Sequence, residues 1–295
     1  MSAVTFPGLG LSFQMDRVAF TVFGHPVYWY GIIIACGFSL AVHYCWRRAP
    51  AFGVIPDHIL DMLLFAVPLS IAGARLYYVL FYLDLYRRPD GSLNFARMVR
   101  VWDGGLAIYG AVIAGVLTVF IFTKIRKLSF AAWADMGCLG LLIGQAVGRW
   151  GNFVNGEAYG GPTALPWRMG VYRLAGGTLQ LLEVHPTFLY ESLWNTAGFC
   201  VLAFLSRGGR RKFDGMLFTC YIAWYGFGRG LIEGMRSDSL YLFQTGIRIS
   251  QLLGFASSAL AVAFLIYHLA VRKHTPEELY VNRINKEVEL YGNHS

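Results

Sequence analysis

The segment 148–160 contains the densest group of side chains that could bind and activate an anionic substrate. It reads Gly-Arg-Trp-Gly-Asn-Phe-Val-Asn-Gly-Glu-Ala-Tyr-Gly. The guanidinium group of Arg149 can form two parallel hydrogen bonds to a phosphate, and the amides of Asn152 and Asn155 can donate to its oxygens. The glycines allow the main chain to approach a ligand closely. We therefore predict a site for an anionic head group here, in preference to a simple glycine-rich turn.

Two further arginines lie inside long apolar runs, where an unpaired charge is costly. Arg75 occurs in Ala-Gly-Ala-Arg-Leu-Tyr-Tyr, and Arg229 occurs in Tyr-Gly-Phe-Gly-Arg-Gly-Leu-Ile-Glu. Tyr225, Arg229 and Glu233 follow one another at intervals of four residues, which places them on one face of a helix. Two interpretations stay open: a buried Arg–Glu pair that fixes helix packing, or a polar face that lines a cavity for a lipid head group. We favour the second, because charged residues within a membrane are usually functional.

The composition indicates that these side chains are positioned by a membrane protein. Of 295 residues, 56% are hydrophobic and 14% are charged, and the mean hydropathy is +0.48. Soluble domains average about 25% charged residues. A disordered chain is excluded by the high hydrophobicity, and a soluble enzyme of this length would lack charged residues to cover its surface. The five cysteines form no CxxC pair, so the sequence predicts no metal site.

Seven apolar runs are long enough to cross a bilayer as helices. They are residues 27–46, 58–82, 105–123, 130–147, 186–206, 215–234 and 249–271. We predict an all-α polytopic membrane protein whose membrane domain covers residues 1–274. The polar stretch 148–185 is expected to form a loop or small cap outside the membrane, and the charged tail 275–295 a short amphipathic helix. The first 25 residues are expected to form a short amphipathic lead-in segment.

Clusters of basic residues predict the orientation, because short cytoplasmic loops carry an excess of Lys and Arg. The clusters follow the first, third, fifth and seventh runs, at 47–48, 124–127, 207–212 and 272–273. The amino terminus and the 148–185 stretch are therefore expected outside, and the carboxyl terminus in the cytoplasm. The basic residues of the outer loops are all arginines, which suits an anionic ligand on that side.

The segment 148–160 resembles the signature of the phosphatidylglycerol–prolipoprotein diacylglyceryl transferase family. Five other segments resemble motifs of the same family, in the family's order along the chain. They are 28–31 (Tyr-Trp-Tyr-Gly), 73–78 (Gly-Ala-Arg-Leu-Tyr-Tyr), 101–105 (Val-Trp-Asp-Gly-Gly), 185–191 (His-Pro-Thr to Tyr-Glu) and 225–236. Six matches in one order argue against coincidence.

The resemblance implies an alkyl transfer between two membrane-bound substrates. The thiol of the lipobox cysteine of a preprolipoprotein attacks the glycerol carbon that bears the phosphate of phosphatidylglycerol. A thioether forms and glycerol phosphate leaves, which is the first step of lipoprotein maturation. The family implies no cofactor and no metal ion, and its place is the bacterial cytoplasmic (inner) membrane. The implied partners are phosphatidylglycerol, lipobox signal peptides and membrane lipid, with no nucleic acid.

The resemblance also implies roles for individual residues. Arg149 and Arg229 correspond to clamps for the phosphate and the leaving group. The substrate-binding residues that it implies, together with Arg149, are Tyr30, Arg75, Asn152, Glu157, Gly160, His185, Tyr225, Glu233 and Arg236.

One position departs from the family's pattern. Where many relatives have Gly-Gly-x-x-x-His-Gly, residues 104–110 read Gly-Gly-Leu-Ala-Ile-Tyr-Gly, so Tyr109 replaces the supposed histidine base. A phenol with a pKa near 10 is a poor base at neutral pH. Tyr109 could donate a hydrogen bond to the phosphate or leaving oxygen, act as a base with a lowered pKa, or pack inertly. We favour the donor and place Tyr109 with Arg149 and Arg229 as catalytic.

Two other functions compete with the transferase. A transporter of an anionic or lipid substrate would share the intramembrane arginines, but it would not need the 148–160 segment, and the chain shows no internal repeat. A seven-span receptor would not explain outward arginines beside a glycine-rich segment. The transferase is therefore our leading prediction, with the transporter as the alternative.

Overall fold

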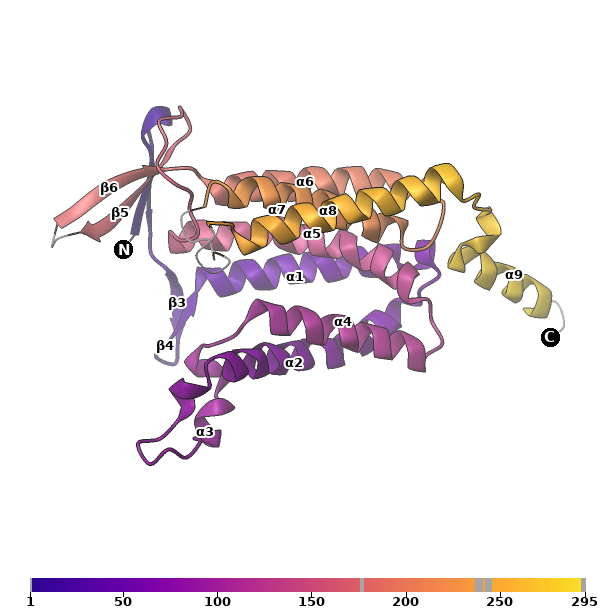
Figure 1. Cartoon of the computed structure of the whole chain (residues 1–295), viewed down its shortest axis with the longest axis horizontal. Coiled ribbons are helices and arrows are strands. Elements are labelled where there is room, and N and C mark those ends of the chain that lie inside the picture. The colour runs from indigo at the N-terminus through magenta and orange to yellow at the C-terminus, as the bar shows by residue number, and fades with distance from the viewer. Residues whose placement is uncertain (1, 176–177, 237–240, 242–245, 293–295) are drawn as a thin grey trace.

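The computed structural model describes residues 2–175, 178–236, 241 and 246–292. Over these residues, seven long helices run back and forth along the longest axis of the molecule (Figure 1). They are α1 (Trp29–Arg48), α2 (Pro56–Phe81), α4 (Ile108–Ile125), α5 (Phe130–Asn155), α6 (Thr187–Leu205), α7 (Met216–Glu233) and α8 (Ile249–Ile266). Each predicted apolar run forms one of these helices, so the helical membrane fold is confirmed.

Six of the helices are long and apolar enough to cross a membrane, and α7 is not among them. Arg229 and Glu233 lie in its last two turns and lower its hydropathy. The helix packs against α5, α6 and α8, so neighbouring helices cover it on several sides. A seventh crossing by α7 stays a prediction.

Strands that the sequence did not predict form a cap at one end of the bundle (Figure 1). One antiparallel sheet has the order β2-β1-β5-β6, and a separate hairpin pairs β3 with β4 and leads into α1. The strands are β1 (Ser2–Phe6), β2 (Leu11–Met15), β3 (Val18–Val22), β4 (His25–Tyr28), β5 (Met169–Ala175) and β6 (Thr178–Val184). The first residues are therefore strands, and the expected amphipathic lead-in segment is absent from the described part of the chain.

Pairing across the chain explains this outcome. β1 pairs with β5, with Val4 opposite Val171, and these two side chains are buried with Met169, Val184 and Phe188 in a small core. The strands thus gain their stability from partners that are remote in sequence. Of the predicted 148–185 stretch, residues 148–155 belong to α5, and the β5–β6 hairpin belongs to the cap. The place of this stretch outside the membrane stays a prediction.

Shorter elements connect and extend the bundle. They are α3 (Phe95–Met98), α9 (Tyr280–Gly292), a π-helical turn (Tyr267–Val271) and single 3-10 turns at Pro7–Leu9, Ala49–Phe52, Leu83–Tyr86, Val101–Asp103 and Pro276–Glu278. Helix α9 lies at the end of the molecule opposite the cap (Figure 1). The helix expected in the charged tail is therefore present.

The local sequence explains how α5 carries part of the 148–160 segment. Ser129 caps its start, because the Ser129 hydroxyl accepts a hydrogen bond of 3.2 Å from the Ala132 N–H. The helix continues past the predicted end of the run at 147 and stops at Gly156, whose φ of 62° favours glycine. Arg149 and Asn152 therefore project from a helix rather than from a loop.

Candidate active site

One buried carboxylate lies at the centre of a polar cluster at the cap end of the bundle. Glu191 of α6 is only 4% exposed, and three guanidinium groups contact it. Arg149 forms an ion pair with Glu191 Oε2. The Nη1 atoms of Arg229 and Arg236 lie 3.4 and 3.3 Å from Glu191 Oε1. We call these four residues the arginine–glutamate cluster.

The antiparallel course of the helices brings this cluster together. Arg149 lies near the end of α5, Glu191 near the start of α6, and Arg229 near the end of α7. Because successive helices reverse direction, these three positions meet at one end of the bundle (Figure 1). Arg236 follows α7 directly and pairs in a short bridge with Gly160.

Gly160 closes the cap onto the cluster through main-chain contacts. Its N–H donates to the His185 carbonyl at 2.9 Å, and the Gly161 N–H donates to the Met235 carbonyl at 2.7 Å. A Cβ atom at Gly160 would lie 2.6 Å from the Cβ of His185. Glycine is therefore required by the close approach of three chain segments.

The helix face predicted on α7 forms an ion pair. Arg229 Nη2 lies 2.6 Å from Glu233 Oε2, one turn further along the helix. Arg229 thus bridges Glu191 and Glu233. Tyr225 lies one turn earlier, and its ring stacks on Tyr221 with the centroids 5.6 Å apart.

The amides of the 148–160 segment bind a carboxylate of the same segment. The Nδ2 atoms of Asn152 and Asn155 each donate to Glu157 Oε1 at 3.1 Å. Asn152 Oδ1 accepts a hydrogen bond of 3.4 Å from Arg149 Nη1. Both amide groups thus donate to Glu157, and Asn152 also holds Arg149, whereas the sequence suggested that the amides would donate to a ligand.

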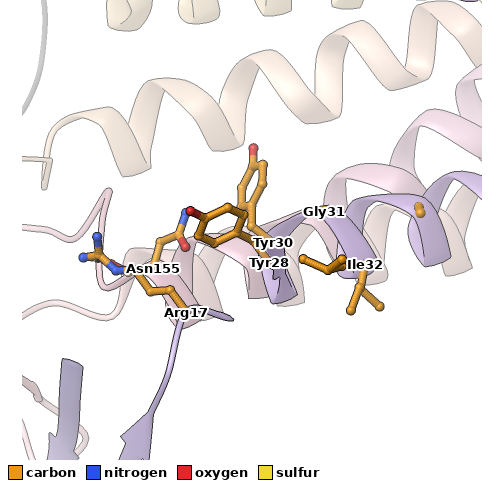
Figure 2. A pocket seen from close by; sticks show the side chains of 8 residues that line it. Arg17, Tyr28, Tyr30, Gly31, Ile32 and Asn155 are labelled. Carbon is orange, nitrogen blue, oxygen red and sulfur yellow. Dashed lines mark hydrogen bonds between the residues drawn. The ribbon is translucent and has the colours of Figure 1, made fainter. Parts of the chain in front are cut away.

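An open pocket of about 650 Å³ lies beside this segment, between the start of α1 and the end of α5 (Figure 2). Tyr28 and Tyr30 lie between Arg17 and Asn155 at one side and Ile32 at the other (Figure 2). Arg17 Nη2 donates to the Asn155 carbonyl at 2.8 Å. A largely apolar wall with a cation at one side suits an amphipathic ligand.

Arg75 lies apart from the arginine–glutamate cluster. Its side chain is buried and donates to the carbonyls of Arg97 at 2.7 Å, Met98 at 2.8 Å and Gly105 at 3.1 Å, and also to that of Gly104. The guanidinium group therefore fixes the 97–105 loop against α2. These contacts explain how an arginine is accommodated within an apolar run.

Among the described residues, Tyr109 and His185 form no hydrogen bond or ion pair with the arginine–glutamate cluster. Tyr109 lies in the first turn of α4, is half-exposed, and has the Tyr77 ring as a neighbour at 6.3 Å. His185 Nδ1 lies 3.4 Å from the Tyr190 hydroxyl, which accepts a hydrogen bond from Trp167. His185 lies two residues before α6, the helix that carries Glu191. Tyr109 lies on α4, which packs mainly against α2.

Sequence reasoning missed two residues of this region. Glu191 lies inside a motif that was recognised, yet it was not predicted to belong to the site. A signal was present, since it is the one charged residue between 187 and 205. Arg17 was also missed, because nothing in the local sequence indicates that it reaches Asn155.

The arginine–glutamate cluster offers partly accessible cations to an anion. Among the described residues, Arg149, Arg229 and Arg236 contact Glu191, and these arginine side chains are between 11% and 21% exposed. Preorganised guanidinium groups can stabilise negative charge that develops in a transition state. The described residues contain no group of three or more His, Cys, Asp or Glu side chains arranged to hold a metal ion.

Comparison with known proteins places the chain among membrane transferases. The family model described as prolipoprotein diacylglyceryl transferase matches residues 17–267. A phosphatidylglycerol–prolipoprotein diacylglyceryl transferase of Oceanobacillus iheyensis is 41% identical over 277 residues, covering 91% of this chain and 92% of that protein. Proteins of the same name are 40% identical in Enterococcus faecalis (94% and 98% covered) and 42% identical in Clostridioides difficile (77% and 86% covered).

Proposed function

The chain belongs to the prolipoprotein diacylglyceryl transferase family, and we propose that its arginine–glutamate cluster is the place where the transfer occurs. The chain is a multi-pass bacterial membrane protein. It is a transferase that moves the diacylglyceryl group of phosphatidylglycerol to a prolipoprotein. The observation that supports this location is the convergence of Arg149, Arg229 and Arg236 on one buried carboxylate.

The charge that develops in the reaction matches this cluster. The thiolate of the lipobox cysteine attacks the glycerol carbon that bears the phosphate. A carbon–sulfur bond forms while the carbon–oxygen bond breaks, and the bonding electrons leave with the phosphate oxygen of glycerol phosphate. Negative charge therefore grows on the leaving group, where guanidinium groups stabilise the transition state more than the bound lipid. We assign this role to Arg149 and Arg229.

The neighbouring residues position these two arginines. Glu191 fixes the spacing of the guanidinium groups, and Glu233 holds Arg229 from the adjacent turn. Asn152 links Arg149 to Glu157. We propose that Gly160 and His185 hold the cap in place over the cluster.

The remaining predicted residues receive roles in binding. Tyr30 lines the open pocket, and we assign to it a lipid chain or the apolar part of the signal peptide. We assign Tyr225 and Arg236 to substrate binding beside the arginine–glutamate cluster. Arg75 acts indirectly, through the loop that its four carbonyl contacts hold. For Tyr109 we retain the role of a hydrogen-bond donor to the phosphate or the leaving oxygen.

The membrane orientation is proposed from the basic clusters. They follow α1, α4, α6 and α8, whose ends lie opposite the cap, on the side of α9 (Figure 1). We propose that the cap and the amino terminus face outward from the cytoplasmic (inner) membrane, with residues 1–274 as the membrane domain and 275–295 as a cytoplasmic tail. A reporter fused after residue 295 should read cytoplasmic, and one inserted in the cap should read external.

A transfer assay tests the proposed site and the competing transport function. The purified protein is mixed with phosphatidylglycerol that carries labelled acyl chains and with a lipobox peptide. Label should move to the peptide cysteine, and a peptide with serine at that position should remain unlabelled. Movement of intact lipid across vesicles without labelled peptide would favour the transporter. Full transfer by Arg149→Ala would disprove the location of the site.

A further inference from the structure

The end of the bundle opposite the cap contains arginines with and without acid partners. Arg211 lies 3.7 Å from Asp135 and 3.8 Å from Asp214, and Arg126 lies 3.3 Å from Asp61. Arg48, the last residue of α1, and Arg207, just after α6, form no ion pair with a carboxylate of the described residues. Arg48 and Arg207, at the ends of α1 and α6, therefore have no ion-pair partner in the described part of the chain.

These two arginines converge on one pair of hydroxyl groups between α1 and α6. Arg48 Nη2 donates to Ser206 Oγ at 3.3 Å. Arg48 and Arg207 both act electrostatically on the Tyr44 hydroxyl, and the Tyr44 ring packs edge-on against Phe199 of α6 at 5.0 Å. Helices α1 and α6 each pack on α5. At this end of the bundle, the side chains of Tyr44 and Arg48 reach from α1 to Phe199 of α6 and to Ser206 at its end.

The buried atoms of this group lack partners of good geometry. Arg48 Nε is buried and has no hydrogen-bond partner among the described residues. The Tyr44 hydroxyl is buried as well, and the Arg207 guanidinium is the neighbour that hydrogen-bonds to it, with poor geometry. A buried donor that bonds to nothing costs free energy, and the cost is higher for a charged group. An anion with several acceptor oxygens would satisfy both the donors and the charge.

We propose that Tyr44, Arg48, Ser206 and Arg207 bind the phosphate of an anionic phospholipid in the leaflet at this end of the bundle. This site is separate from the transfer site, which lies at the cap end. A lipid suits the place because both helices carry exposed apolar side chains close in sequence to the polar group, Trp46 of α1 and Phe204 of α6. Anionic lipids are concentrated in the cytoplasmic leaflet, where clusters of basic residues attract them.

Lipid binding by purified, delipidated full-length protein in detergent tests the proposal. Bound phosphatidic acid is measured by native mass spectrometry, with phosphatidylcholine as the neutral lipid. All proteins carry Arg149→Ala, so that the outer cluster contributes little. If each arginine donates a hydrogen bond of about 1 kcal/mol to the lipid phosphate, Arg207→Gln should weaken binding about fivefold and Arg48→Gln/Arg207→Gln about 25-fold. The matched control Arg47→Gln removes a charge from the same turn of α1 and should leave the affinity unchanged.

The outcomes separate the lipid from its alternatives. Equal affinity in the double variant and in Arg47→Gln would overturn the site. Inorganic phosphate that displaces phosphatidic acid at equal concentration would show that free phosphate is the ligand, and would overturn the lipid assignment. If the double variant fails to fold, Arg207→Gln decides the matter, because Arg207 is exposed and its replacement spares the core. An unchanged affinity in that variant would also overturn the proposal.

Discussion

The two ends of the helix bundle each contain a cluster of acidic and basic side chains, and the clusters differ in charge and access. At the cap end, Arg149, Arg229 and Arg236 surround Glu191, with Glu233 beside them. At the other end, Asp135 and Asp214 share one arginine, Arg211. Among the described residues, three arginines at the cap end thus share one buried carboxylate, Glu191, whereas at the other end two aspartates share Arg211.

Burial separates them further. The side chains of Asp135, Arg211 and Asp214 are 0%, 6% and 10% exposed. Asp135 accepts hydrogen bonds of 2.9 Å from the N–H groups of Gly215 and Phe218, which begin α7. Its oxygens are thus occupied by the main chain, and the cluster joins α5 to α7.

The aspartate cluster also holds the carboxyl-terminal helix. Asp214 accepts a hydrogen bond of 2.8 Å from the Tyr280 N–H at the start of α9. Burial raises the pKa of the Asp214 carboxyl, while this hydrogen bond and Arg211 oppose the rise. The comparison teaches that buried charge has a structural role where main-chain groups satisfy it, and can bind a ligand where guanidinium groups converge and stay partly accessible.

Replacement of Arg149 should give the largest loss of activity. We expect Arg149→Ala to lower kcat/KM by roughly 10³-fold, as for removal of a donor that stabilises transition-state charge. Arg149→Lys should fail nearly as badly, because lysine lacks the fork. The unfolding temperature should change little, since Glu191 keeps Arg229 and Arg236. Near-normal turnover by the lysine variant, at normal membrane levels, would disprove bidentate binding.

Replacement of Asp135 should affect stability and spare chemistry. Asp135→Ala leaves Arg211 with Asp214 alone and two N–H groups without their acceptor, which should cost about 3 kcal/mol of unfolding free energy. The kcat/KM of the folded fraction should stay close to that of the parent. Denaturation in detergent, with activity normalised to folded protein, measures both. A large loss of activity without a loss of stability would erase the distinction between the two clusters.

The Arg229–Glu233 pair tests the division of roles within the cap-end cluster. Arg229→Ala should lower kcat/KM roughly 100-fold, because it removes a cation near the leaving group. Glu233→Gln should have a smaller effect, about tenfold, because it loosens the arginine and leaves its charge. Steady-state transfer kinetics give both values. If the double variant Arg229→Glu/Glu233→Arg kept full activity, the role of the pair would be purely structural.

The smallest effect is expected at Tyr109. A lost hydrogen bond of ordinary strength corresponds to roughly a fivefold loss of rate. If Tyr109 acts as a hydrogen-bond donor, Tyr109→Phe should lower the rate equally at all pH values. Rates measured across pH for this variant, with Tyr109→His in parallel, check this. Loss of a limb that rises at alkaline pH would indicate a base instead. An unchanged rate would remove Tyr109 from the mechanism.

The sequence by itself determined the helical framework and half of the cap-end cluster. Apolar length gave each long helix, because a membrane requires about 20 apolar residues in a row. The spacing of Arg229 and Glu233 predicted their ion pair, since residues four apart meet on a helix. Both inferences rest on contacts within one segment, which periodicity encodes directly.

Only the tertiary structure decided which remote segments meet. Glu191 joins Arg149, Arg229 and Arg236, which lie on other segments, and β1 pairs with the remote strand β5, where Val4 lies opposite Val171. The same holds for Arg75, whose partners are carbonyls of a distant loop. Apolar runs predict which segments form helices, and clusters of basic residues predict the direction in which each helix crosses the membrane. The rotation of each helix about its axis, which selects these partners, depends on side-chain packing between helices.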